Sequence, residues 1–129
     1  MNKRLAATGA FLALLAVALG AFGAHGLKKL VPADTIQTFQ TGVHYQMVHA
    51  LALLLTGLFY EKCSQKLLQL AGIFFITGIL LFSGSLYLLT VFRASEITGW
   101  ERIGIVTPIG GLAFIAGWLC LLLGILSKK

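Results

Sequence analysis

Three histidines are the side chains of this sequence best suited to chemistry, because histidine exchanges a proton near neutral pH and binds metal ions. His44 and His49 are five residues apart, whereas two ligands on one helical face need a spacing of three or four. We therefore predict no metal site, although a histidine-only site with His25 as third ligand stays geometrically open. The only aspartate is Asp34, so no serine–histidine–aspartate set exists. The sequence argues against an enzymatic function without deciding the question.

Hydroxyl groups accompany these histidines inside otherwise apolar stretches. If the stretches are helices that alternate in direction across a membrane, their polar residues collect in one half, which we assign to the outer side. We predict a ligand-binding polar cluster there, made of His25, His44, Tyr45, His49, Ser83, Ser85, Tyr87 and Thr107. Two interpretations are open. The cluster is a small polar cavity for a headgroup, a water chain or a small ligand, or it is a hydrogen-bonded network that locks the helices together.

The elements that must position these residues are four apolar stretches, at residues 5–24, 44–60, 67–92 and 107–126. Each is close to the ~20 residues with which a helix crosses a ~30 Å hydrocarbon layer. Hydrophobic residues make up 58% of the chain, and the mean hydropathy is +0.93. Residues 1–129 are expected to form a single transmembrane domain. The first stretch resembles a cleavable signal peptide, but we interpret it as a retained span.

Glycine and other small residues recur in a seven-residue rhythm along the spans. In lipid, helices associate through close backbone approach at small residues, and a 3.5-residue repeat keeps such a stripe facing its partner. The predicted fold is therefore all-α: a compact antiparallel four-helix transmembrane bundle. The residues expected at its helix contacts are Gly9, Gly20, Gly78, Gly110, Gly117 and Gly124.

Two connections carry helix signals of their own. In the first loop, Pro32 and Asp34 indicate a helix start, and residues 36, 39, 43 and 47 share one helical face. We predict a short amphipathic helix along the outer interface that bends or runs into the second span near Gly42, the alternative being a plain N-terminal extension of that span. Before the fourth span, Thr107 is expected to cap the helix, with Pro108 at its first position.

The charges point to a membrane orientation and not to nucleic acid. The net charge is +6, but the cations flank the spans, and no basic stripe with interleaved aromatic residues exists. One side carries Lys3, Arg4, Lys62, Lys66, Lys128 and Lys129, and the other carries Lys28, Lys29, Arg93 and Arg102. This bias predicts that both termini are cytoplasmic. Cys63 and Cys120 are at different depths, so both are expected to be free thiols.

Several motifs, in order along the chain, resemble the YgdD-like family of small membrane proteins, known as domain of unknown function 423. They are Gly20-Ala21-Phe22-Gly23-Ala24-His25-Gly26-Leu27, Tyr45 with His49-Ala50-Leu51-Ala52, Phe82-Ser83-Gly84-Ser85-Leu86-Tyr87, and Thr107-Pro108-Ile109-Gly110-Gly111 followed by Gly117-Trp118. The resemblance covers essentially the whole chain. It implies a four-span protein of the bacterial inner membrane, with relatives in eukaryotes. It implies no activity, because the family is one of unknown function.

Competing functional hypotheses follow from these features. The first is a non-enzymatic scaffold or accessory subunit, which contacts a membrane-protein partner or a second copy of itself through small-residue faces. The alternative is binding or transport of a lipid, quinone or small polar solute at the outer-half cluster. A membrane enzyme using His25 or His49 is the weakest hypothesis, because no nucleophile–base–orienter set is visible. The bilayer is the expected partner, and we predict no cofactor and no nucleic acid.

Overall fold

The computed structural model describes residues 1–127, and within them the chain is helical, without a strand. The long helices are α1 (Lys3–His25), α2 (Ala33–Leu58), α3 (Gln65–Gly78), α4 (Gly84–Ala94) and α5 (Val106–Leu126). Three short elements complete the fold: the 3₁₀ turns η1 (Leu27–Lys29) and η3 (Trp100–Ile105), and the π-helical segment η2 (Ile79–Ser83) that joins α3 to α4. The all-helical class predicted from the sequence is confirmed.

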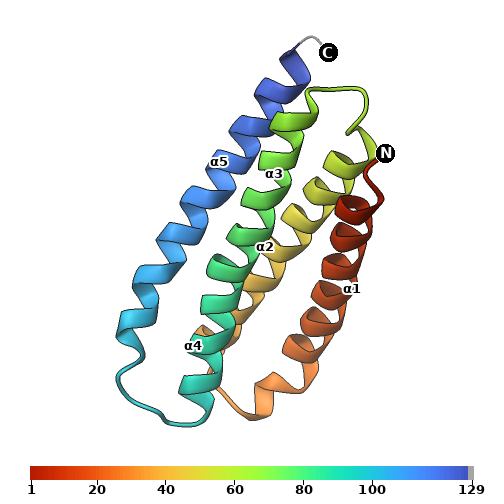
Figure 1. The fold of residues 1–129 in the computed structure, drawn as a ribbon. Coiled ribbons are helices and arrows are strands. Elements are labelled where there is room, and N and C mark those ends of the chain that lie inside the picture. The colour runs from red at the N-terminus through yellow and green to blue at the C-terminus, as the bar shows by residue number, and fades with distance from the viewer. Residues whose placement is uncertain (128–129) are drawn as a thin grey trace.

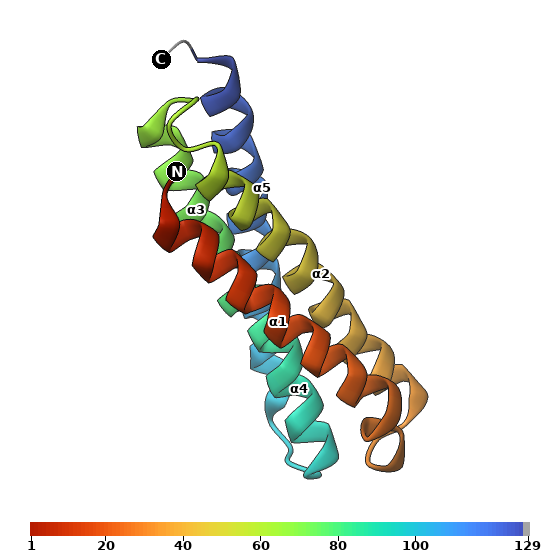
Figure 2. The same ribbon diagram turned by 90° about the vertical axis from the view of Figure 1, so that its right-hand side faces the viewer.

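The helices lie side by side along one direction, and α3, η2 and α4 form one rod (Figure 1). Contacts are densest between α1 and α2 and between α3 and α5. Viewed from the side, α1 stands in front, and α5 lies behind it beyond the other helices (Figure 2). The arrangement is therefore flattened. The α2 and α3–η2–α4 rods form its centre, and α1 and α5 occupy opposite edges.

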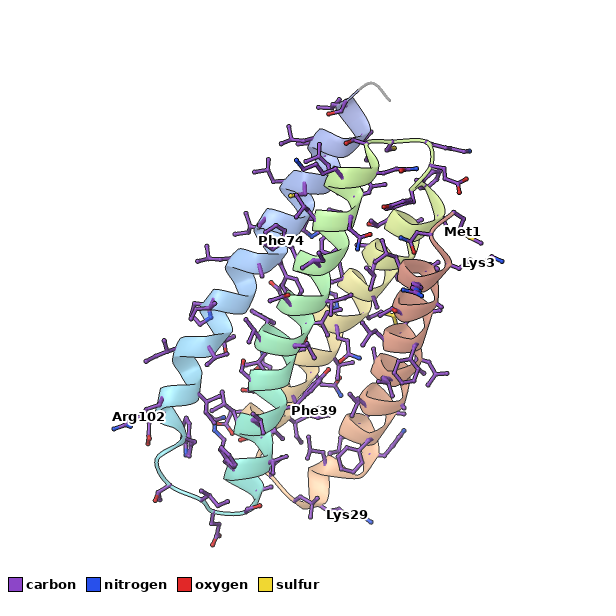
Figure 3. All side chains as sticks on the ribbon, viewed as in Figure 1. Met1, Lys3, Lys29, Phe39, Phe74 and Arg102 are labelled. Atoms are coloured by element: carbon purple, nitrogen blue, oxygen red, sulfur yellow. The ribbon has the colours of Figure 1, made fainter. Side chains whose placement is uncertain are left out.

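Two backbone hydrogen bonds tie one end of the molecule together. The Asn2 amide donates to the Gly57 carbonyl at 2.8 Å, and the Ser64 amide donates to the Gly124 carbonyl at 3.2 Å. The start of α1 therefore meets the end of α2, and the end of α5 meets the connection between α2 and α3, as antiparallel neighbours require. Figure 3 shows Lys3 at this end and Lys29 and Arg102 at the other.

Three helical segments are long and apolar enough to cross a membrane: Lys3–Lys29, Gln65–Ala94 and Trp100–Leu126. They include the predicted spans 5–24, 67–92 and 107–126. The α2 helix is long enough as well, with 26 residues, but His44, Gln46 and His49 make it less apolar. Its polar side chains are the core of the site described below.

The predicted placement of the first-loop helix along the outer interface is wrong. The α2 helix runs unbroken from Ala33 to Leu58, so the alternative, an N-terminal extension of the second span, describes the structure. The apolar face was identified correctly, but it is covered by protein. Phe39 and Val43 are buried together with Ala16 of α1 and Leu27 of η1, so this face does not lie on headgroups.

The predicted start of the fourth span is also wrong. Thr107 does not cap α5, because the 3₁₀ turns of η3 lead directly into the helix and Ile105 at the boundary has helical backbone angles. The Val106 amide already donates to the Ile103 carbonyl. The start of α5 is therefore not the open set of backbone donors that a Thr107 cap implies, and Pro108 lies within its first turn.

Candidate functional site

The predicted polar cluster is divided in the structure into separate groups at different positions along the helices. The first joins α1, α2 and α4. The Tyr87 hydroxyl donates to Gln46 Oε1 at 2.7 Å, and Gln46 Nε2 donates to the Leu12 carbonyl at 2.8 Å. Nearby, the Ser83 hydroxyl donates to the Gly42 carbonyl at 2.7 Å and fixes η2 to α2. Each bond crosses between helices, as polar groups at membrane depth are expected to do.

The second group joins α4 to the start of α5. The hydroxyls of Ser85 and Thr107 are hydrogen-bonded to each other at 2.5 Å, and Ser85 also donates to the Phe82 carbonyl at 2.8 Å. Thr107 thus contributes a bond between helices in place of the predicted cap.

The third group surrounds His49, which is buried between α2, α3 and α5. The Trp118 indole N–H donates to His49 Nε2 at 3.0 Å, and His49 Nδ1 lies 2.7 Å from the Tyr45 carbonyl oxygen. An indole N–H can only donate, so Nε2 accepts and the proton is on Nδ1, which donates to Tyr45. The imidazole stacks on Phe114, with ring centroids 3.6 Å apart and planes inclined by 12°. Both nitrogens are engaged, so His49 holds no free group for acid–base chemistry.

The other two histidines do not join this group. His25 ends α1 and is exposed, and no hydrogen bond or ring contact of it occurs within residues 1–127. His44 is also exposed, and its ring lies edge-on to Tyr45 at 6.0 Å. In the same range, no three histidine, cysteine, aspartate or glutamate side chains converge as metal ligands do. The open possibility of a three-histidine metal site has no geometric support.

Two site residues were missed by sequence reasoning. Gln46 is the centre of the first group, and Trp118 is the partner of His49. An amide side chain inside an apolar span is itself a signal for helix–helix hydrogen bonding, and Gln46 was open to that inference. Trp118 stands in the family motif, but nothing local to it indicates a contact 69 residues away.

Hydrogen bonding is complete among the buried side chains. In the part of the chain that the structure describes, no buried side-chain nitrogen or oxygen lacks a partner. Their hydrogen-bond partners, which lipid cannot supply, therefore come from within the chain. These groups behave as the locking network of the second interpretation.

The glycines expected at helix contacts lie at close approaches. A Cβ atom at Gly9 would be 2.5 Å from the Leu54 amide nitrogen, and one at Gly117 would be 2.7 Å from the Phe75 ring. The same construction meets the Phe82 backbone at Gly110, the Phe114 ring at Gly78 and the Leu68 side chain at Gly124. Gly20 is looser, with Val43 at 3.3 Å. The small-residue faces are therefore used inside the molecule.

A pocket opens between α2 and α5, where the two backbones stay apart and side chains fill the seam. Its volume is about 470 Å³, and Tyr45, His49, Phe82, Phe114 and Trp118 line it together with residues 108–115 of α5. We call it the α2–α5 pocket. A second hollow of about 310 Å³ lies on the same seam toward the α2–α3 connection, lined by apolar residues that include Leu55, Phe59, Leu121 and Ile125. No cation or carboxylate lines either one.

Comparison with known proteins identifies relatives but no activity. The family described as "Protein of unknown function (DUF423)" matches residues 19–111. The UPF0382 membrane protein YwdK of Bacillus subtilis is 46% identical over 112 residues, which cover 86% of each chain. A UPF0382 membrane protein of Haemophilus influenzae is 42% identical, over 88% of this chain and 86% of its own. The inner membrane protein YgdD of Escherichia coli is 40% identical, over 88% and 82%. No solved structure matches the chain.

Proposed function

The chain belongs to the DUF423 family of membrane proteins, and we propose that it is a non-enzymatic scaffold or accessory subunit of the bacterial cytoplasmic membrane. In this proposal residues 1–129 form one domain with four spans, because α2 crosses the membrane together with the three more apolar segments. The polar side chains of α2 are compatible with hydrocarbon because their partners lie on neighbouring helices. The excess of cations beside the α2–α3 connection and both termini favours cytoplasmic termini.

One observation carries the scaffold proposal. All buried polar side chains of the described residues are partnered within the chain, and His49, the best candidate for acid–base work, uses both ring nitrogens, one on the Tyr45 carbonyl of its own helix and one on Trp118 of α5. A site built for catalysis needs a group with a free donor or acceptor directed at the substrate. Here the polar groups serve helix packing.

The surface for a partner differs from the one expected from the sequence. The glycine faces pack against other helices of the same chain, so a partner must contact helix faces that are exposed on the surface of the molecule. The α1 helix packs mainly on α2 and exposes Ala7, Ala10, Ala18 and Ala21 on its other side. Small residues allow a second helix to approach closely in lipid. We therefore place the contact with a partner, or with a second copy of this chain, on the outer face of α1.

Photo-crosslinking in native membranes tests this proposal. A photoreactive residue at Ala10 or Ala18 should give one discrete adduct, whereas the same residue at exposed Leu122 of α5 should not. Mixing two differently tagged copies tells a homo-oligomer from a foreign partner. Lipid-only labelling at every position would contradict the scaffold proposal.

A second candidate function is favoured by the α2–α5 pocket. Its volume of about 470 Å³ lies in the range of small-molecule sites, ~300–1,000 Å³. The candidate site for a lipid, quinone or small polar solute is therefore the seam between α2 and α5 and not the whole outer-half cluster expected from the sequence. Native mass spectrometry of protein taken from its own membrane tests it, because a retained small molecule has a defined mass.

A further inference from the structure

We propose that the α2–α5 pocket binds a flat, carbonyl-bearing ring carried on a long apolar tail, which is the chemistry of a prenylquinone. The proposal rests on the second candidate function and names its ligand class. It concerns binding alone and includes no electron transfer.

The walls of the pocket suit a planar group. The rings of Tyr45 and His49 are inclined by 10°, and those of His49 and Phe114 by 12°, so their faces share one orientation. Phe82 closes one side, with its ring centroid 4.5 Å from that of Tyr45. Tyr45 and Trp118 keep 40% and 44% of their surfaces exposed. His49 and Phe114 are buried against each other, and the Trp118 indole is inclined by 66° to His49, so the partly exposed Tyr45 ring is the face on which a planar ligand would stack.

One hydrogen-bond donor of the pocket is left unused. His49 and the Trp118 indole bond to each other, but the Tyr45 hydroxyl has no hydrogen bond among residues 1–127. A phenolic O–H in hydrocarbon lacks the water that would otherwise accept its proton. A ligand carbonyl supplies that acceptor.

The absence of charge in the pocket distinguishes a quinone from a phospholipid. Tyr45 lies near the middle of α2, twelve residues after Ala33 and thirteen before Leu58, while on α5 the pocket extends from Pro108, in the first turn, to Trp118. No cation lines the pocket, so a phosphate there would be buried without a counter-charge. A neutral ring with carbonyl groups needs none.

The seam also offers a place for the tail. The apolar hollow of about 310 Å³ continues the α2–α5 seam toward the α2–α3 connection, and its walls include Leu55, Phe59, Leu121 and Ile125. A prenyl chain leaving the pocket along the seam would be covered by these side chains. Its burial needs no polar partner.

A saturable binding experiment with matched variants tests the proposal. Full-length protein with Trp100→Phe, which leaves Trp118 as its single indole, is placed in nanodiscs of quinone-free phosphatidylethanolamine and phosphatidylglycerol. Short-tailed ubiquinone and menaquinone are then titrated while Trp118 fluorescence is followed. We expect saturable quenching. Tyr45→Phe, which removes one hydrogen bond and keeps the ring, should weaken binding about tenfold, whereas Tyr60→Phe outside the pocket should not.

A blocking variant guards against a folding artefact. Gly111 lines the pocket, and a Cβ there would meet only Phe82, at 3.9 Å, so Gly111→Leu fills the pocket without disturbing a helix contact. Gly104→Leu is its control, because no neighbouring atom lies within 4 Å of a Cβ at that position. Gly111→Leu should abolish saturable quenching and keep the melting temperature of the parent protein.

The outcomes separate this proposal from the one on which it rests. Quenching that rises linearly with quinone and is the same in Gly111→Leu would overturn the quinone proposal. If native mass spectrometry then shows a phospholipid that Gly111→Leu releases, the pocket is still a ligand site and only the ligand class is wrong. If nothing is retained in either protein, both proposals fail.

Discussion

The indole N–H of Trp118 bonds to Nε2 of His49 across 3.0 Å, and this bond joins α5 to α2 where the two backbones are not in close contact. The same imidazole bonds to the Tyr45 carbonyl and stacks on Phe114. The His49 side chain thus contacts the preceding turn of α2 and two successive turns of α5, and it fills the seam between these two helices.

His49→Ala should therefore destabilise the protein. The substitution leaves the Trp118 N–H without its acceptor and opens a cavity beside Phe114, so we expect a loss of about 2 kcal/mol in unfolding free energy. Thermal unfolding in detergent measures it. His44→Ala is the control, because His44 is exposed and should tolerate the change. Equal stability of both variants would show that the His49 contacts are dispensable to the fold.

Gly117→Leu should disrupt the packing of α5 on α3. A Cβ atom added at this position would lie only 2.7 Å from the Phe75 ring, and Phe75 is fully buried, so the larger side chain has no space. We expect a cost of about 2 kcal/mol from overpacking, seen as a lower melting temperature. Gly104→Leu, placed in open space, provides the comparison. An unchanged melting temperature for Gly117→Leu would mean that the close contact yields easily.

Tyr87 and Gln46 should be energetically coupled. Tyr87→Phe removes the donor to Gln46 Oε1, while Gln46→Leu removes the acceptor together with the bond to Leu12. A double-mutant cycle should give a coupling of about 0.6–1.7 kcal/mol, the size measured for hydrogen bonds between helices in membranes. Additive single effects would indicate that the two side chains act independently.

The orientation predicts the behaviour of topology reporters. Six cations beside both termini and the second connection, against four on the other side, place the C-terminus in the cytoplasm. A reporter that works only in the cytoplasm should be active when fused after Lys129 and inactive when inserted at Asp34. The reverse pattern would invert the orientation and leave the helix packing untouched.

The sequence predicts the elements of this fold better than their surroundings. The period of the hydrophobic residues and the spacing of the small residues identify helix faces, and Gly110, Gly117 and Gly124 do lie against neighbouring helices. The periodicity at Phe39 and Val43 is equally visible, but nothing in it tells whether headgroups or α1 will cover that face.

The polar site shows a similar limit. Counting residues places His25 and His44 near the same depth, but depth alone does not fix the direction in which a side chain leaves its helix, and both are exposed. Pairings such as His49 with Trp118 depend on how α2 and α5 are rotated about their axes. That rotation follows from packing across all the helices, and the π-helical segment Ile79–Ser83, which carries no obvious sequence signal, contributes to it.

The division of contacts bears on how the protein is made. The α1–α2 hairpin has the densest internal packing, and α3 with α5 forms a second hairpin that meets it along the centre. A ribosome completes α2 before it begins Tyr87 or Trp118, so Gln46 and His49 enter the bilayer before their partners exist. Gln46 already has the Leu12 carbonyl within its own hairpin, but His49 must wait for the last helix. Arrival of Trp118 is thus the step that makes the second helix fully compatible with the membrane interior, and a chain truncated before α5 should be retained by the insertion machinery or degraded.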